Sequence, residues 1–238
     1  MKRFIKNNDI LRRLYYRVRR AKGQSDEAAI LDRLTEQSAR TFVAFGFHPA
    51  EFNCAALARK PEWQGLLIDG NPRQVRDGRA LFPDRIKVEE AFLTLGNLDL
   101  IRSAFPKIGV LSIDVDGNDY WFLKGLIDMS PDVICIEYNS TFGSESITVP
   151  YDPSFDRYAK HPSGWYHGAF LTALSELCAK SGYGLAAVSN AGGNAFFTRD
   201  GMLDSARAWK PSLLRQQYSG VPHDEQWLTV KDLPFERV

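Results

Sequence analysis

The chain has 238 residues, of which 44% are hydrophobic and 25% charged, a balance typical of a globular protein with one large domain. A net charge of +1 excludes a uniformly basic surface, and no apolar run reaches the ~18 residues that a membrane-spanning helix needs. The charge is uneven, however, because nine of the 30 basic residues fall within residues 1–22, where Asp9 is the only acid.

The cysteines and the N-terminal residues indicate a cytoplasmic protein. Cys54, Cys135 and Cys178 are odd in number, widely separated and set in apolar patterns, so we expect reduced core residues. They lack the spacing of zinc ligands, and the N-terminal residues lack the apolar core and small-residue cleavage site of a secretory signal.

Residues 1–40 are predicted to form a basic helical extension, with a first helix in the basic segment 1–22 and a second over 26–40. In the first helix, basic residues alternate with apolar residues at helical spacing, namely Ile10, Leu11, Leu14, Tyr15 and Val18. Such a helix fits an anionic membrane surface or a nucleic acid. We favour the alternative, a helix docked on the domain or on a second subunit, because nothing else in the chain indicates nucleic acid.

From residue 41 the pattern alternates between short apolar runs and amphipathic segments. Five strand–helix repeats of this kind predict a parallel sheet with right-handed crossovers. The strands are expected at 41–46, 65–69, 85–90, 110–113 and 132–138, and the helices at 49–59, 72–80, 97–104 and 120–127.

The alternation stops after residue 138. Residues 139–163 are rich in Ser, Thr, Pro, Gly and Asp, and their length predicts a functional lid or substrate loop. A helix is then expected over 164–178, and a hairpin of strands at 183–189 and 194–199. We therefore predict a domain over 41–200, to which a short helix and irregular tail, 201–238, also belong.

Acidic side chains end several of the predicted strands. Asp114 and Asp116 follow the fourth strand, Asp69 ends the second and Glu137 the fifth. In open α/β sheets the carboxyl ends of the strands line the ligand crevice, so these acids are expected to meet there. Two neighbouring acids resist joint ionisation unless a cation or hydrogen-bond donors compensate them, which indicates a chemical role.

Four strings resemble the FkbM-like branch of the class I S-adenosyl-L-methionine (SAM) methyltransferases over about residues 41–200. They are Gly65-Leu-Leu-Ile-Asp-Gly-Asn-Pro72, Glu90-Ala-Phe-Leu-Thr94, Ser112-Ile-Asp-Val-Asp-Gly-Asn-Asp-Tyr120 and Ile136-Glu-Tyr-Asn139. The resemblance implies an α/β Rossmann-like class I methyltransferase fold, with a mostly parallel seven-stranded sheet and a C-terminal antiparallel hairpin. It also implies SAM-dependent O-methylation of a hydroxyl on a small molecule or saccharide.

The same resemblance assigns residues to SAM. Asp69 would hold the ribose, because a carboxylate accepts from both hydroxyls, although an acid beside a helix N-terminus is the alternative. Glu90, Ala91 and Phe92 would border the adenine, although Glu90 could equally be a solvated charge at the strand end. The full set is Phe45, Gly46, Phe47, Asn53, Asp69, Gly70, Glu90, Ala91 and Asp114.

The first-strand loop departs from the family pattern. It has the single Gly46, and Ala44 stands where an acid is expected. The alternative function is accordingly a catalytically silent Rossmann-like binding module that its basic arm recruits to a surface.

Catalysis is expected to involve His167 as a base, together with Asp114 and Asp116. Asp114, Glu137 and Asn139 resemble the ligands of magnesium-dependent O-methyltransferases, and hard oxygen ligands suit Mg²⁺. In the alternative without a metal, Asp114 and Asp116 bind backbone amides and the ammonium group of SAM. The acceptor is expected to contact His48, Asn139, Tyr151, Trp165 and Tyr166.

Overall fold

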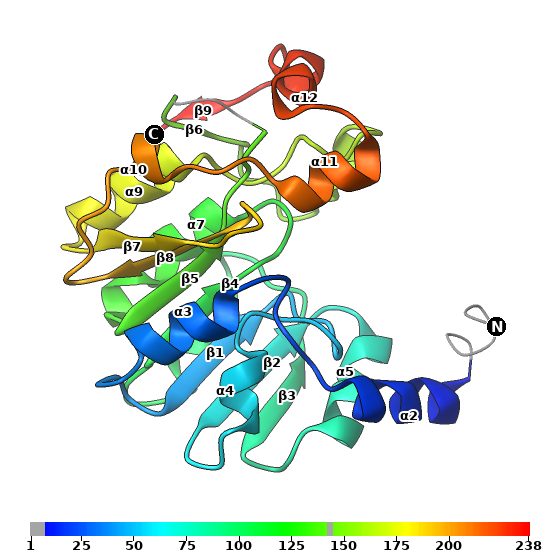
Figure 1. Cartoon of the computed structure of the whole chain (residues 1–238). Helices are drawn as coiled ribbons and strands as arrows, with labels where there is room; N and C mark the ends of the chain where they lie inside the picture. The colour runs from blue at the N-terminus through cyan, green and yellow to red at the C-terminus, as the bar shows by residue number, and fades with distance from the viewer. Residues whose placement is uncertain (1–7, 142–144) are drawn as a thin grey trace.

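The computed structural model of the chain describes residues 8–141 and 145–238, so residues 1–7 of the predicted arm lie outside the described residues (Figure 1). At its centre is a seven-stranded sheet of order β3-β2-β1-β4-β5-β8-β7. The first five strands of this order, β3, β2, β1, β4 and β5, pair in parallel, and β8 runs antiparallel to its neighbours β5 and β7. The bounds are β1 Thr41–Phe45, β2 Gln64–Asp69, β3 Ile86–Glu90, β4 Val110–Ile113, β5 Val133–Glu137, β7 Gly184–Val188 and β8 Asn194–Thr198.

The sheet has a hydrophobic core on each face because successive strand residues point to opposite sides. In β1, Val43 and Phe45 enter one core, whereas Phe42 and Ala44 enter the other. The predicted parallel sheet with its C-terminal hairpin is therefore confirmed, and all seven predicted strands are present.

Helices cover both faces of the sheet. One core receives apolar side chains from α3 (Glu27–Leu34), α4 (Ala55–Arg59) and α5 (Pro72–Leu81). The other receives them from α6 (Asp99–Arg102), α7 (Asp119–Leu126, followed by the 3-10 turn η1, Ile127–Met129) and α9 (Leu171–Lys180).

Four predicted helices are shorter than expected. The helix predicted over 97–104 is the short helix α6, Asp99–Arg102. The helix predicted over 26–40 ends at Leu34, where the Thr35 hydroxyl donates to the Leu31 carbonyl. The helix predicted over 49–59 begins only at Ala55, because the backbones of His48 and Glu51 exchange two hydrogen bonds in a tight turn. The helix predicted from residue 164 begins at Leu171.

The segment 164–170 is irregular rather than helical. Gly164 and Gly168 have positive φ angles of 68° and 61°, which a helix does not allow. The Phe170 amide then donates to the carbonyl of Ile147, so this segment runs beside the short strand β6 (Ile147–Thr148).

The C-terminal tail is more ordered than predicted. It contains α10 (Ser205–Ala208), α11 (Leu213–Ser219) and α12 (His223–Val230), and it ends in β9 (Glu236–Arg237), which pairs antiparallel with β6. Figure 1 shows this red segment returning over the yellow-green loop region that carries β6 and α8 (Arg157–Lys160). Val230 is fully buried in the core.

The first helix of the extension, α2 (Asp9–Arg19), lies against α5 (Figure 1). Arg12 donates to both carboxylate oxygens of Asp77, at 2.5 and 3.0 Å, and Arg13 donates at 2.9 Å. The charged side of the helix therefore faces the domain. Its apolar side faces outward, since Ile10 and Val18 are each 77% exposed. Within the described residues, no helix has the length and apolar character needed to cross a bilayer.

Candidate functional site

A cleft of about 760 Å³ opens at the carboxyl ends of β1, β2 and β4, and we call it the sheet-end cleft. Seven of the nine residues predicted to bind SAM line it, and two catalytic or substrate candidates join them. The predicted residues on its walls are Phe45, Gly46, Phe47, His48, Asp69, Gly70, Ala91, Asp114 and Asp116.

Gly46 allows the backbones after β1 and β4 to approach each other. Its φ is +79°, and an added Cβ would lie 1.5 Å from the carbonyl oxygen of Asp114. Only glycine fits both the conformation and the space. The single glycine of this loop is therefore sufficient to make the turn.

Asp69 sits at the end of β2 with its carboxylate on the cleft wall. One of its oxygens accepts from the amide of Asn71 at 2.7 Å, and burial raises the pKa of the carboxyl. The cap of α5 is Asn71, whose side chain accepts from the amides of Arg73 and Gln74. Asp69 therefore lies at the N-terminus of α5 as well as on the cleft wall, and both of its predicted roles, ribose ligand and acid beside the helix N-terminus, stay predictions.

Two residues predicted for SAM lie outside the lining of this cleft. Asn53 is buried and donates to the side chain of Asn194 at 3.2 Å. Glu90 is exposed beyond Asp69 on the neighbouring strand. Of the three residues predicted to border the adenine, Ala91 and Phe92 line the cleft and Glu90 does not, and Phe92 is 62% exposed.

The turn after β4 carries three acids with different surroundings. Asp119 is buried and accepts from the amides of Val115 and Gly117, both at 2.9 Å, so it holds the turn. Burial raises the pKa of Asp119 to about 6. Burial, and then Glu137 and Asp116, raises the pKa of Asp114 well above its ordinary value. Asp116 has a positive φ of 58° and forms an ion pair with Arg157.

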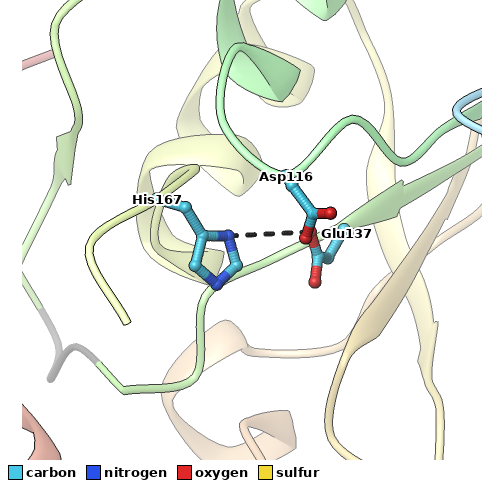
Figure 2. Close-up of side chains that lie close together, drawn as sticks. All are labelled: Asp116, Glu137 and His167. Atoms are coloured by element: carbon cyan, nitrogen blue, oxygen red, sulfur yellow. Dashed lines mark ion pairs between the residues drawn. The ribbon is translucent and has the colours of Figure 1, made fainter. Parts of the chain in front are cut away.

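Glu137, at the end of β5, and His167 converge with Asp116, as Figure 2 shows. The Nδ1 atom of His167 lies 3.7 Å from Oε2 of Glu137, beyond a direct hydrogen bond. On the other side of the ring, Arg215 donates to Nε2 at 2.8 Å, which places the ring proton on Nδ1. Burial and the two guanidinium groups of Arg157 and Arg215 lower the pKa of His167 well below its ordinary value.

This arrangement changes the expected acid–base roles. His167 is fully buried and neutral, and its Nε2 already accepts from a guanidinium, so its Nδ1–H points toward Glu137 without forming a hydrogen bond. Burial, followed by the charges of Asp116 and Asp119, raises the pKa of Glu137 to about 8. Glu137 is therefore a carboxyl group that can exchange its proton near neutral pH, as is Asp119, whose carboxylate already accepts from two backbone amides.

The residues present do not fit the predicted magnesium site. The side-chain oxygen of Asn139 already accepts from the Thr141 amide at 3.0 Å and from Arg215 at 2.7 Å. Asp116, Glu137 and His167 have ligand atoms within 4.8 Å of one another. However, Arg157 pairs with Asp116 and Arg215 occupies the histidine, so cationic groups stand where a cation would bind.

A second cavity, of about 600 Å³, lies beside Glu137, and we call it the arginine pocket. Its walls come from α8, α11 and the segment around Trp165, with further residues near Gln24 and Glu51. Loop residues 145–163 are fixed between the two cavities. Asn118 donates to the Asp152 carbonyl at 2.7 Å, and Phe155 packs over Gly117, where a Cβ would come within 2.3 Å of its ring.

The predicted substrate residues divide between the two cavities and the protein interior. Trp165 lines the arginine pocket, whereas His48 lines the sheet-end cleft and contacts Tyr16 of α2. Tyr151 accepts from the Leu95 amide, at 3.0 Å, and lines neither cavity. Tyr166 is buried and donates to the Pro234 carbonyl, and Asn139 is buried within hydrogen bonds.

Sequence reasoning missed Arg157 and Arg215, and it gave Glu137 only a metal-binding role. Arg157 and Arg215 lie in segments without strong periodicity and meet only through the tertiary structure. No local pattern identifies them.

No protein-family model matches this chain, and no curated protein matches it. Solved structures do resemble it. They include cofactor-bound Rv0187 from MTB, at 14% identity and a TM-score of 0.50, over 74% of this chain and 80% of that one. The O-methyltransferase from Bacillus cereus in complex with SAH has 16% identity, a TM-score of 0.48 and coverage of 72% and 76%.

Fibrillarin from Aeropyrum pernix, with natively bound S-adenosyl-L-methionine, has 12% identity and a TM-score of 0.47, over 72% of this chain and 73% of that one. At these identities the likeness concerns the fold. The chain has the Rossmann-like α/β fold with a mostly parallel seven-stranded sheet that was predicted.

Proposed function

We propose that the chain is a SAM-dependent methyltransferase that methylates a hydroxyl group of a small molecule or saccharide. The observation that carries the proposal is the sheet-end cleft, which brings Gly46, Asp69 and Asp114 together at the carboxyl ends of three adjacent parallel strands. This is the edge at which open α/β sheets bind nucleotide-like ligands. The strings that resemble FkbM-like proteins supply the turns of this edge and support that branch.

In the proposed complex, different residues of the sheet-end cleft bind different parts of SAM. Asp69 accepts from the ribose hydroxyls with the oxygen that Asn71 leaves free, and Phe92 and Ala91 flank the adenine. Gly46 brings the backbone close to the ligand, and Asp114 and Asp116 face its ammonium group. When bound, SAM supplies a methyl group on a sulfonium leaving group, so departure needs no acid.

Glu137 is proposed as the general base. As an ionised carboxylate it takes the proton of the acceptor hydroxyl while the oxygen forms its bond to the methyl carbon and the carbon–sulfur bond breaks. His167, which holds its proton on Nδ1 through Arg215, faces the second oxygen of Glu137 and positions the carboxylate. The remaining contribution of the protein is alignment of the donor and the acceptor.

Calorimetric titration with S-adenosylhomocysteine (SAH) tests the proposal. We expect the wild-type chain to bind SAH, and Asp69→Ala to bind it at least about tenfold more weakly, because a charge-assisted hydrogen bond contributes about 1.5–3 kcal/mol. Asp84→Ala, which changes an exposed acid in the turn before β3, is the matched control and should bind like the wild type. Absence of wild-type binding at millimolar SAH would favour the silent binding module.

We further propose that α2 rests on an anionic membrane surface. Its outward side carries Ile10, Leu14 and Val18, all more than half exposed, and Arg17 lies beside this stripe at helical spacing. The buried pair of Arg12 and Asp77 fixes that orientation. The cytoplasmic face is the proposed location, since the three cysteines are free and buried.

A further inference from the structure

The arginine pocket is lined by Glu137, Arg157 and Arg215 and by the aromatic residues Tyr158, Trp165 and Tyr218. We infer that this pocket holds the methyl acceptor and that the acceptor carries an oxyanion group, a carboxylate or a phosphate, which Arg157 and Arg215 bind. The inference rests on the proposed methyl transfer and narrows its acceptor to a hydroxy acid or a hydroxylated phosphate ester.

The two cavities meet at the acids of Figure 2. Asp116 lines the sheet-end cleft and forms an ion pair with Arg157, which lines the arginine pocket. Glu137 lines the arginine pocket, and its carboxylate lies within 4.8 Å of that of Asp116. A hydroxyl in the arginine pocket is therefore next to the proposed base and close to the cleft that holds the methyl donor.

Arg215 is a buried guanidinium whose described partners are all neutral. It donates to Asn139 Oδ1 at 2.7 Å, Thr141 Oγ1 at 2.6 Å and, through its other terminal nitrogen, to the His167 ring. Among the described side chains, no carboxylate lies within 4.0 Å of it. Burying an uncompensated charge is costly, and burial accordingly lowers the pKa of Arg215.

The guanidinium of Arg215 retains donors for a ligand. It has five N–H groups, and the three hydrogen bonds above use three of them, so two have no acceptor among the described residues. Arg157 likewise donates from Nε to the Gly164 carbonyl at 2.8 Å and from Nη1 to Asp116. Its Nη2 has no acceptor among the described residues and can donate to a ligand. Donors from α8 and α11 thus converge on one pocket.

The charge of the pocket favours an anion. Three basic side chains, Lys22, Arg157 and Arg215, line it against the acids Glu51 and Glu137. The pKa of about 8 keeps Glu137 mostly protonated at neutral pH. Planar guanidinium groups bind carboxylate and phosphate oxygens in pairs, with geometry that neutral hydroxyls do not match. Tyr158 and Tyr218, 67% and 86% exposed, leave aromatic surface at the rim for the body of the ligand.

Titration of the full chain with simple probes tests the inference. Inorganic phosphate, acetate and glycerol are added at constant ionic strength, with and without SAH, and binding is followed by the NMR line widths of each probe. We expect phosphate or acetate to saturate one site at millimolar concentrations, and glycerol not to. Arg215→Gln should weaken that binding at least about tenfold. Arg207→Gln, an exposed arginine of α10, is the matched control.

Each result has a defined meaning. Saturation by phosphate alone supports a phosphate ester as acceptor, and saturation by acetate supports a hydroxy acid. Failure of both probes to saturate overturns the inference, as does equal binding by the wild type, Arg215→Gln and Arg157→Gln. If thermal unfolding shows that Arg215→Gln does not fold, the oxyanion binding of Arg157→Gln tests the inference in its place. If the chain binds oxyanions but does not bind SAH, the arginine pocket is an oxyanion site and the proposed methyl transfer is wrong.

Discussion

At the scale of single residues, Glu137 is the group on which the proposed chemistry depends. It ends β5 between two guanidinium groups and two other acids, and the pKa of its carboxyl is raised to about 8, chiefly by burial. A base with a pKa near the working pH combines availability with strength. The same carboxylate at a solvated strand end would be fully ionised and a weak base.

The pH dependence of activity and stability should reflect this carboxyl. We expect kcat/KM to rise with pH through about 8, because only the ionised form accepts a proton. Glu137→Gln should remove that rise and lower the rate by about 10²–10⁴-fold. The raised folded-state pKa also means that stability falls as pH rises from 4.5 through about 8, relative to Glu137→Gln. Steady-state kinetics and chemical denaturation measure the two effects.

Glu62→Gln is the control for this prediction, because Glu62 is exposed and distant from both cavities. Glu62→Gln should show the same dependence of kcat/KM and of stability on pH as the wild type. A wild-type profile without a rise near pH 8, or the same rise in Glu137→Gln, contradicts the role of Glu137.

Gly46 offers a second test at this scale. Gly46→Ala adds left-handed strain and a Cβ 1.5 Å from the Asp114 carbonyl oxygen, so we expect a loss of about 2 kcal/mol or more in the free energy of unfolding. Gly220→Ala has a similar φ of +69° but nothing within 4 Å, so it isolates the strain and should cost about 1 kcal/mol. Equal losses in urea denaturation would show that the β1–β4 contact is not close.

At the scale of elements, the sequence predicts best what is periodic. The strands were predictable because runs such as Val110–Ile113 are buried on both faces, and α5 because Pro72 follows a capping residue. The segment 164–170 is not the predicted helix, and its two glycines, which disfavour a helix, are a local signal against that prediction. Its pairing with β6 is a tertiary contact, and no local pattern contains it.

The orientation of α2 leads to a prediction for lipid binding. We expect the chain to cosediment with vesicles that contain phosphatidylserine more than with phosphatidylcholine alone. Leu14→Asp combined with Val18→Asp should weaken this at least about tenfold, since a buried aliphatic side chain contributes about 1.5–3 kcal/mol. Met202→Asp is the control, because it changes an apolar residue outside α2 that is 94% exposed, and it should leave cosedimentation with the vesicles unchanged.

Two outcomes contradict the membrane assignment. One is equal cosedimentation by the wild type and the double variant. The other is a lipid-independent dimer that the double variant dissociates, which would assign the apolar stripe to a second copy of the chain.

At the scale of the whole molecule, the site depends on parts that are distant in sequence. The parallel direction of the strands follows from the alternating pattern and places Asp69, Asp114 and Glu137 at one edge of the sheet, as predicted. The position of Arg215 follows from the return of the tail across the loop region and from its bonds to Asn139 and Thr141. Sequence reasoning therefore predicted residues of the sheet-end cleft, which the strand ends build, and missed the wall of the arginine pocket that the C-terminal tail builds.

A crystal structure of the full chain with SAH tests the central claim most directly. We predict SAH in the sheet-end cleft, with its ribose hydroxyls hydrogen-bonded to Asp69, its adenine against Phe92 and its sulfur toward Asp116 and Glu137. SAH bound elsewhere, or bound in this cleft with its ribose away from Asp69, would contradict the assignment.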